Sequence, residues 1–124
     1  MSEHVRDYDI HLDDKFGQLA AIDLDREAAA HEPWFNQTLT TVNDAVVRLG
    51  ILEGEFHWHK HDEQDEFFVV LEGQLLIDVE DRETIVLHRH QGYTVPRGVR
   101  HRTRAPHRTA VLMVEAAGVA PTGD

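Results

Sequence analysis

The chain has 124 residues, which is enough for one domain with a continuous core and too few for two. Hydrophobic residues make up 41% of it and charged residues 28%, and these proportions exclude wholesale disorder and a fibrous repeat. The 12 basic and 23 acidic side chains give a formal net charge of −11, which repels nucleic-acid phosphates and anionic lipid head groups. We therefore expect no nucleic-acid partner and no membrane partner.

Cysteine is absent from the chain, which excludes a disulfide framework, a thiolate zinc site, an iron–sulfur cluster and a cysteine nucleophile. Residues 1–7 do not show a basic segment followed by an apolar one, and no apolar run has the length of a membrane span. Together these features predict a cytoplasmic protein.

Residues 1–43 are polar and mixed, and two short helical patterns occur in them. Phe16, Leu19 and Ala20 have helical spacing, and residues 25–30 begin with acidic side chains and continue with strong helix formers. We expect a partly helical N-terminal segment that packs on the outside of the remaining chain.

From residue 44 onward, short runs of β-branched, leucine and aromatic residues alternate with turn residues. Such runs recur about every 8–12 positions, the rhythm of an all-β sandwich or barrel. The predicted strands are Ala45–Leu52, Glu55–His61, Glu66–Leu71, Leu75–Val79, Thr84–His88, Tyr93–Val95, His101–Arg104 and Thr109–Glu115. Short strands without a crossover helix predict a jelly roll over residues 44–117, followed by a C-terminal tail at residues 118–124.

The predicted strand 66–71 is apolar on both faces. Phe68 and Val70 lie on one face, while Phe67 and Val69 lie on the other. A sandwich strand with one face in solvent would instead alternate apolar and polar residues. We therefore expect the second face to be covered by the N-terminal segment or by another subunit, and we predict a homodimer.

Ten histidines are a high content for this length, and six of them lie between His57 and His101. Successive side chains of a strand point to opposite faces, so His57, His59 and His61 are expected to line one wall. Glu66 begins the next strand and could return its carboxylate to that wall. Imidazoles and a carboxylate suit divalent iron, manganese, nickel, zinc or cobalt, and such an ion offsets the cost of burying them.

This stretch resembles the first cupin motif, with His59-x-His61, Glu66 and, after six intervening residues, Gly73. Residues 92–101 resemble the second cupin motif, and their Pro-x-Gly-x-x-His pattern is intact. The chain is similar to small single-domain bacterial cupins of the cupin 2 type, loosely described as similar to mannose-6-phosphate isomerase. The shared phrases are Trp58-His59-Lys60-His61, Asp65-Glu66-Phe67, Val70-Leu71-Glu72-Gly73, the segment 95–101 and the ending Pro121-Thr122-Gly123-Asp124.

The resemblance implies a double-stranded β-helix, the cupin jelly roll, which is usually dimeric and holds one metal ion inside the barrel. The ligands that it implies are His59, His61, Glu66 and His101. An alternative for these four residues is a hydrogen-bonded polar cluster without a metal ion.

Two neighbouring residues have more than one interpretation. Asp65 could replace Glu66 as the acidic ligand, although strand parity and the step to Gly73 favour Glu66. His57 is a candidate catalytic base, a candidate fifth ligand, or a histidine whose ring is satisfied by ordinary hydrogen bonds.

A basic run surrounds the second motif. Arg100, Arg102 and Arg104 have the parity opposite to the motif's histidine, so we expect them to point outward and to pair with surface carboxylates. Arg97 lies in the preceding turn and is the candidate substrate contact.

These observations predict a metal-dependent enzyme that acts on a small polar metabolite. Isomerase, lyase and dioxygenase chemistry all agree with the expected ligand set, and the fold cannot choose among them. The alternative is a non-catalytic cupin that binds a small molecule or a metal ion as a sensor. A further alternative is a vestigial site in a chain that serves mainly as an interaction partner.

Overall fold

The computed structural model describes residues 8–123, which form eight strands and one helix. The elements are β1 (Asp9–His11), α1 (Leu24–Ala29), β2 (Phe35–Val42), β3 (Ala45–Glu55), β4 (Glu66–Glu72), β5 (Leu75–Val79), β6 (Ile85–Leu87), β7 (Gly92–Val95) and β8 (His101–Ala116). The predicted all-β jelly roll with a short, partly helical N-terminal segment is confirmed. Within the described range, no helix is long and apolar enough to cross a membrane.

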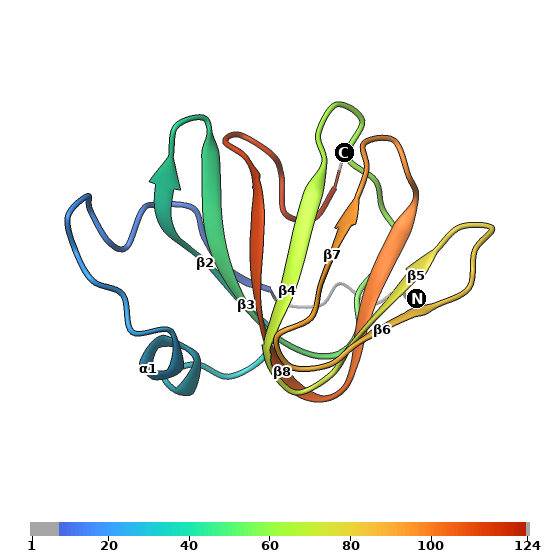
Figure 1. Cartoon of the computed structure of the whole chain (residues 1–124), viewed down its shortest axis with the longest axis horizontal. Helices are drawn as coiled ribbons and strands as arrows, with labels where there is room; N and C mark the ends of the chain where they lie inside the picture. Colours follow the sequence, from blue (N-terminus) through green and yellow to red (C-terminus); the bar gives the residue numbers. More distant parts are fainter. Residues whose placement is uncertain (1–7, 124) are drawn as a thin grey trace.

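Strand β8 organises the sheet, because it pairs antiparallel with β3, β4 and β5. Its beginning, residues 101–104, lies against β5, and its later part, residues 109–116, runs between β3 and β4. Figure 1 shows β8 turning at the bottom of the view, so that its two halves form opposite walls. The two strands predicted on either side of Pro106 are therefore one bent strand, and the space between its halves is the interior of the barrel.

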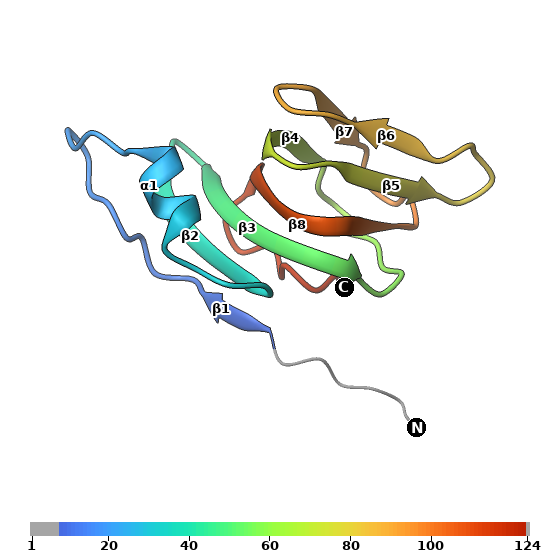
Figure 2. The ribbon, with the colours of Figure 1, turned by 90° about the horizontal axis from the view of Figure 1, so that it is seen from below.

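The two faces of the sheet bury separate apolar clusters. Inside the barrel, Leu52, Phe68 and Ile77 belong to one cluster. On the outer face, Leu49 and Ile51 of β3 pack with apolar residues of β2, α1 and the N-terminal segment. Figure 2 shows α1 lying against β2 and β3, with β1 at the edge of the sheet. The N-terminal segment thus covers part of one outer face, while the inner face lines the interior of the barrel.

The helix predicted around Phe16 is not formed. The backbone N–H of Lys15 donates to the carbonyl of Thr38 at 3.1 Å, and that of Phe16 donates to the carbonyl of Leu39 at 2.9 Å. These two bonds fix residues 15 and 16 alongside β2 in a non-helical conformation.

The helix predicted at residues 25–30 is confirmed as α1. The carboxylate of Asp23 caps its first turn by accepting a hydrogen bond from the backbone N–H of Arg26 at 3.1 Å. At the other end, the guanidinium of Arg108 donates to the carbonyl of Ala28 at 2.5 Å. This last bond joins α1 to strand β8.

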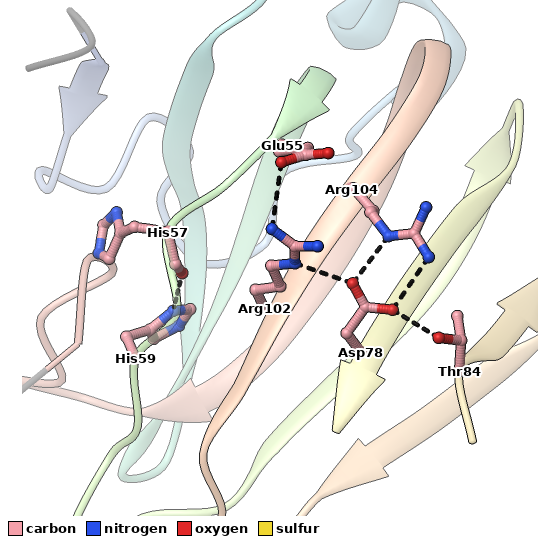
Figure 3. A network of polar contacts seen from close by, with 7 residues as sticks. All are labelled: Glu55, His57, His59, Asp78, Thr84, Arg102 and Arg104. Atoms are coloured by element: carbon pink, nitrogen blue, oxygen red, sulfur yellow. Dashed lines mark hydrogen bonds and ion pairs between the residues drawn. The ribbon is translucent and has the colours of Figure 1, made fainter. Parts of the chain in front are cut away.

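A polar network lies on the outside of the barrel wall (Figure 3). The carboxylate of Asp78 accepts hydrogen bonds from Arg102 at 2.8 Å, from Arg104 at 2.7 Å and from Thr84 at 2.6 Å. Arg102 also pairs with Glu55 at 3.1 Å. The hydrogen bond from Arg104 holds the pKa of Asp78 well below its ordinary value. Both arginines point outward and pair with carboxylates, as their parity predicted.

Candidate metal centre

The histidine-rich stretch leaves the sheet where β3 ends. The predicted strand 55–61 is not formed. Strand β3 ends at Glu55, and His59 makes only an isolated bridge to His101 at the start of β8. The N–H of His59 donates to the carbonyl of His101 at 2.9 Å, and the reverse bond measures 2.8 Å. The carbonyl of His61 accepts a hydrogen bond from the N–H of Gly98 at 2.8 Å. These three bonds hold the loop against the start of β8 and against the turn that precedes it.

Four side chains meet inside the barrel: His59, His61, Glu66 and His101. Each offers one possible ligand atom, and these atoms lie within 4.8 Å of one another. Oε1 of Glu66 lies 3.3 Å from Nε2 of His61 and 3.5 Å from Nε2 of His101. His61, Glu66 and His101 are only 2%, 4% and 1% exposed. The structure therefore brings together the four residues that the two motifs indicated.

Backbone carbonyls orient two of the imidazole rings. Nδ1 of His59 lies 3.0 Å from the carbonyl oxygen of His57, and Nδ1 of His101 lies 3.0 Å from that of Val99. A carbonyl oxygen only accepts, so each Nδ1 carries the proton and each Nε2 keeps its lone pair. Metal-binding histidines are commonly held by such a bond at their other ring nitrogen.

The electrostatics of the group favour a neutral His59 and an ionised Glu66. Burial is the main cause that lowers the pKa of His59 to about 4, and the nearby His101 adds to it. Burial disfavours the ionised form of Glu66, but the imidazoles of His101 and His61 outweigh it and lower the pKa of Glu66 to about 2. These are the protonation states that a divalent ion needs in its ligands.

The unpartnered atoms of the group fit a metal ion. Among residues 8–123, no hydrogen-bond partner is found for either ring nitrogen of His61, for Oε1 of Glu66 or for Nε2 of His101. Buried polar atoms in native proteins are nearly always partnered, and a cation bound between these atoms would satisfy them together. Imidazole nitrogens and one carboxylate match the preferences of the first-row divalent metals.

His57 lies apart from this group. The Nε2–H of His57 donates to the carbonyl of Thr122 at 2.6 Å, so Nδ1 accepts from the hydroxyl of Tyr8 at 3.3 Å. Its ring stacks on Phe56, with the centroids 4.3 Å apart. Figure 3 shows the ring directed away from His59, while the backbone carbonyl of His57 faces it. With both nitrogens engaged, the ring matches the interpretation of a histidine satisfied by hydrogen bonds.

Asp65 and Arg97 pair with each other at the surface. The backbone N–H of Arg97 donates to the carboxylate of Asp65 at 2.9 Å, and the two side chains lie 3.7 Å apart. Both side chains are more than half exposed. Asp65 is therefore not in the buried group, and Arg97 does not line the cavity beside it.

A cavity of about 360 Å³, partly open to solvent, reaches the group beside His59 and Glu66. The other lining residues could not be predicted from the sequence. They come from several strands and loops, and the feature that they share is a side chain that points into the barrel. They are Trp34, Asn36, Leu52, Phe56, Phe68, Thr103, Met113 and Pro121.

A second buried carboxyl group lies next to the site. Glu115 of β8 is the cross-strand neighbour of Glu66, and its Oε1 lies 3.4 Å from Nε of the buried Arg48. Burial, followed by the negative charge of Glu66, raises the pKa of Glu115 to about 9 although Arg48 opposes this. Burial and the charge of Glu66 thus favour the neutral form of Glu115 beside an ionised Glu66. In the sequence, the sign of this buried contact is Arg48, which is a charged residue within an apolar strand.

Comparison with known proteins connects this geometry to a family. Residues 45–116 match the family described as Cupin domain. Over 80 residues, 64% of this chain and 71% of the relative, the sequence is 49% identical to uncharacterized protein YdbB of Bacillus subtilis (strain 168).

Two solved structures show the same fold. A cupin-2 domain containing protein from Shewanella frigidimarina NCIMB 400 is 31% identical, with a TM-score of 0.73 over 77% of this chain and 93% of that one. Hydroquinone 1,2-dioxygenase from Sphingomonas sp. TTNP3, solved with 4-hydroxybenzoate bound, is 19% identical, with a TM-score of 0.73 over 82% of this chain and 33% of that one. At that identity the second likeness shows the fold alone.

Proposed function

Since the chain belongs to the cupin family, we propose that it binds one divalent transition metal ion and acts as a metal-dependent enzyme on a small molecule. The proposed ligands are His59, His61, Glu66 and His101. The observation that carries this proposal is the set of buried, unpartnered nitrogen and oxygen atoms that converge inside the barrel. The proposed metal is iron, manganese, nickel, zinc or cobalt, because all of these accept this donor set.

The chain's own residues account for orientation and for exclusion of water. The carbonyls of His57 and Val99 hold two imidazoles with Nε2 free, and Glu66 supplies one negative charge. The apolar lining of the cavity keeps bulk water from a molecule bound there. When bound, a divalent ion supplies a Lewis acid that polarises a substrate carbonyl or helps to activate oxygen. Isomerase, lyase and dioxygenase chemistry all share this arrangement.

Thermal unfolding with and without zinc tests the metal site. Binding to the folded state stabilises it by about 2.7 kcal/mol when free zinc is 100 times the dissociation constant, which raises Tm by several degrees. We expect this shift in the wild type and in His88→Ala, which removes an exposed histidine, but not in His61→Ala. Equal shifts in all three proteins would contradict the proposed ligand set.

Turnover separates an enzyme from a binding protein. Protein loaded with each candidate metal is incubated with a panel of small metabolites, while oxygen consumption and product formation are followed. Oxygen uptake indicates a dioxygenase, and product without oxygen uptake indicates an isomerase or a lyase. Binding without turnover throughout the panel contradicts the enzyme and leaves the second candidate.

The second candidate is a non-catalytic cupin that binds a metal ion or a small molecule as a sensor. Its support is the enclosure of the site, because His61, Glu66 and His101 are almost fully buried. In addition, Gly123 of the C-terminal segment packs so closely on His59 that a Cβ there would lie 2.5 Å from the histidine Cβ.

We also propose a homodimer that forms through the outer face of the sheet. Phe67 of β4 is 37% exposed there, and its cross-strand neighbours include Val114, which in turn pairs with Val47. Sedimentation equilibrium is expected to give about twice the chain mass of 14.2 kDa, and Phe67→Asp is expected to give the monomer mass. A monomeric wild type would contradict the dimer.

A further inference from the structure

The cavity beside the metal-binding group has an aromatic wall whose rings support one another. The ring centroids of Tyr8 and Trp34 lie 5.7 Å apart, those of Tyr8 and Phe56 4.9 Å, and those of Trp34 and Phe56 5.5 Å. Phe56 also meets the ring of His59 edge to face, with the centroids 5.2 Å apart. The wall therefore continues up to the metal-binding group, and it offers a fixed surface on which a flat ring can pack.

A second hollow, of about 280 Å³, continues this apolar surface. It shares lining residues with the cavity, and it adds apolar residues of the N-terminal segment. The shared residues are Trp34, Asn36, Leu52, Phe56 and Pro121. Together the two hollows form one mainly apolar surface, and such a lining with few polar groups is typical of small-molecule sites in proteins.

Few polar side chains face this space. Asn36 of β2 is the cross-strand neighbour of Gly50, and its Oδ1 is buried without a hydrogen-bond partner among the described residues. Thr103 of β8 is also buried and lines the same cavity. A ligand hydroxyl can donate to Oδ1 of Asn36, and a hydroxyl or carbonyl oxygen of the ligand can accept from the hydroxyl of Thr103, whereas a purely apolar ligand would leave Oδ1 of Asn36 unpartnered.

The charge of the lining excludes strongly anionic ligands. Over residues 8–123, no lysine or arginine lines the cavity, and its ionised side chain is Glu66. Arg97 pairs with Asp65 outside it, and Arg102 lies on the outer wall. A phosphate group carries about −1.5 to −2 charges and is normally bound by arginine or lysine, so a sugar phosphate finds no counter-charge from the chain here.

We propose that the cavity binds a small ring compound that carries hydroxyl or carbonyl oxygens and no phosphate. Its ring packs on Trp34 and Phe56, and its oxygens meet Asn36, Thr103 and the metal-binding group. This inference rests on the proposed function only for the contact between the ligand oxygens and the metal-binding group. The contacts with Trp34, Phe56, Asn36 and Thr103 do not require a metal ion.

Heteronuclear NMR tests the proposal on the zinc-loaded and the metal-free protein, with catechol and mannose 6-phosphate as probes. The two tryptophans provide an internal control, because Trp34 lines the cavity and Trp58 lies against Arg100 and Arg102 on the outer wall. The variant Trp58→Phe assigns the two indole N–H signals. We expect catechol to shift the Trp34 signal saturably and to leave the Trp58 signal in place, while mannose 6-phosphate shifts neither.

A matched pair of asparagine variants tests the polar contact. Asn36→Ala is expected to weaken catechol binding about five- to tenfold, the effect of one lost hydrogen bond. Asn43→Gly removes an exposed asparagine with φ of 51°, where glycine fits, and is expected to change nothing. Unchanged affinity in Asn36→Ala would overturn the assigned contact.

Two further outcomes overturn the proposal: no saturable shift with catechol, or binding of mannose 6-phosphate at the same or lower concentration. The zinc content of the same samples is measured alongside. Samples that hold zinc but do not bind catechol contradict this inference and leave the metal site standing. Protein that holds no zinc after loading contradicts the proposed function, and its catechol titration still tests the cavity.

Discussion

The Nε2–H of His57 donates to the carbonyl oxygen of Thr122 at 2.6 Å and so joins the loop after β3 to the end of the chain. Residues 117–123, the C-terminal strap, follow β8 and return to this loop. Figure 1 shows the red strap ending beside the green loop that precedes β4. Arg48 holds the strap at a second point, by donating to the carbonyl of Val119 at 3.2 Å. The strap thus lies next to His59 and forms part of the wall of the site.

The variant His57→Ala is expected to release the strap without removing the metal site. The hydrogen bond to Thr122 is lost, so the amide of Gly123, which donates to the carbonyl of Ala120 at 3.0 Å, becomes less protected. Hydrogen exchange is expected to be several-fold faster at Gly123 and unchanged in β8. His88→Ala serves as the control. Equal protection in wild type and variant, or loss of metal, would contradict this role.

Two glycines with positive φ differ in what surrounds them. Gly73 (φ 94°) is crowded, because a Cβ there would collide with Oγ1 of Thr109 and lie 3.0 Å from the carbonyl oxygen of Arg108. At Gly98 (φ 75°), such a Cβ would have no atom of residues 8–123 within 4 Å apart from the neighbouring residues of the chain. Gly73→Ala is expected to destabilise the fold by about 3 kcal/mol and Gly98→Ala by about 1–2 kcal/mol. Urea unfolding measures both, and equal losses would contradict the role of Thr109.

The Asp78 network is expected to stabilise the barrel near neutral pH. Asp78→Asn replaces a carboxylate that is bonded to Arg102 and Arg104, so a loss of about 1–3 kcal/mol is expected. Glu80→Gln removes an exposed ion pair with Arg100 and is expected to cost less than about 0.5 kcal/mol. Urea unfolding at neutral pH compares the two variants with the wild type.

The pH dependence of this loss has a defined sign. The pKa of Asp78 is lower in the folded chain than its ordinary value of 3.8, chiefly because of the hydrogen bond from Arg104. The stabilisation is therefore complete above the unfolded pKa and decreases as the pH falls below about 4. The stability difference between wild type and Asp78→Asn should narrow in that range. A difference that stays constant from pH 7 to pH 3 would contradict the account.

The features that were predicted correctly are those that depend on residues close together in the sequence. Strand β5 has the predicted bounds Leu75–Val79, because an apolar run is enclosed there by turn residues. His59, His61 and Glu66 come from one short stretch of chain, so their spacing was enough to place them together. Their roles as ligands remain a prediction that the metal measurements test.

The features that were missed depend on distant parts of the chain. Strand β2 was not predicted, because Asn36 and Thr38 put polar side chains on a face that lies inside the barrel. The buried contact between Arg48 and Glu115 joins positions far apart in sequence, so the charge of Arg48 within an apolar strand marks one end of the contact but does not identify its partner. His57 was expected to share a wall with His59, but the chain leaves the strand geometry after β3 and turns its ring toward the strap.

Elemental analysis of purified protein after chelation and reloading tests the central claim most directly. The wild type is compared with His101→Ala, which removes a proposed ligand, and with His107→Ala, which removes an exposed histidine of the same strand. Circular dichroism verifies that each protein is folded. The account predicts close to one equivalent of a divalent transition metal in the wild type and in His107→Ala, and almost none in His101→Ala. A folded wild type that holds no metal after reloading, or a His101→Ala variant that holds as much as the wild type, would contradict it.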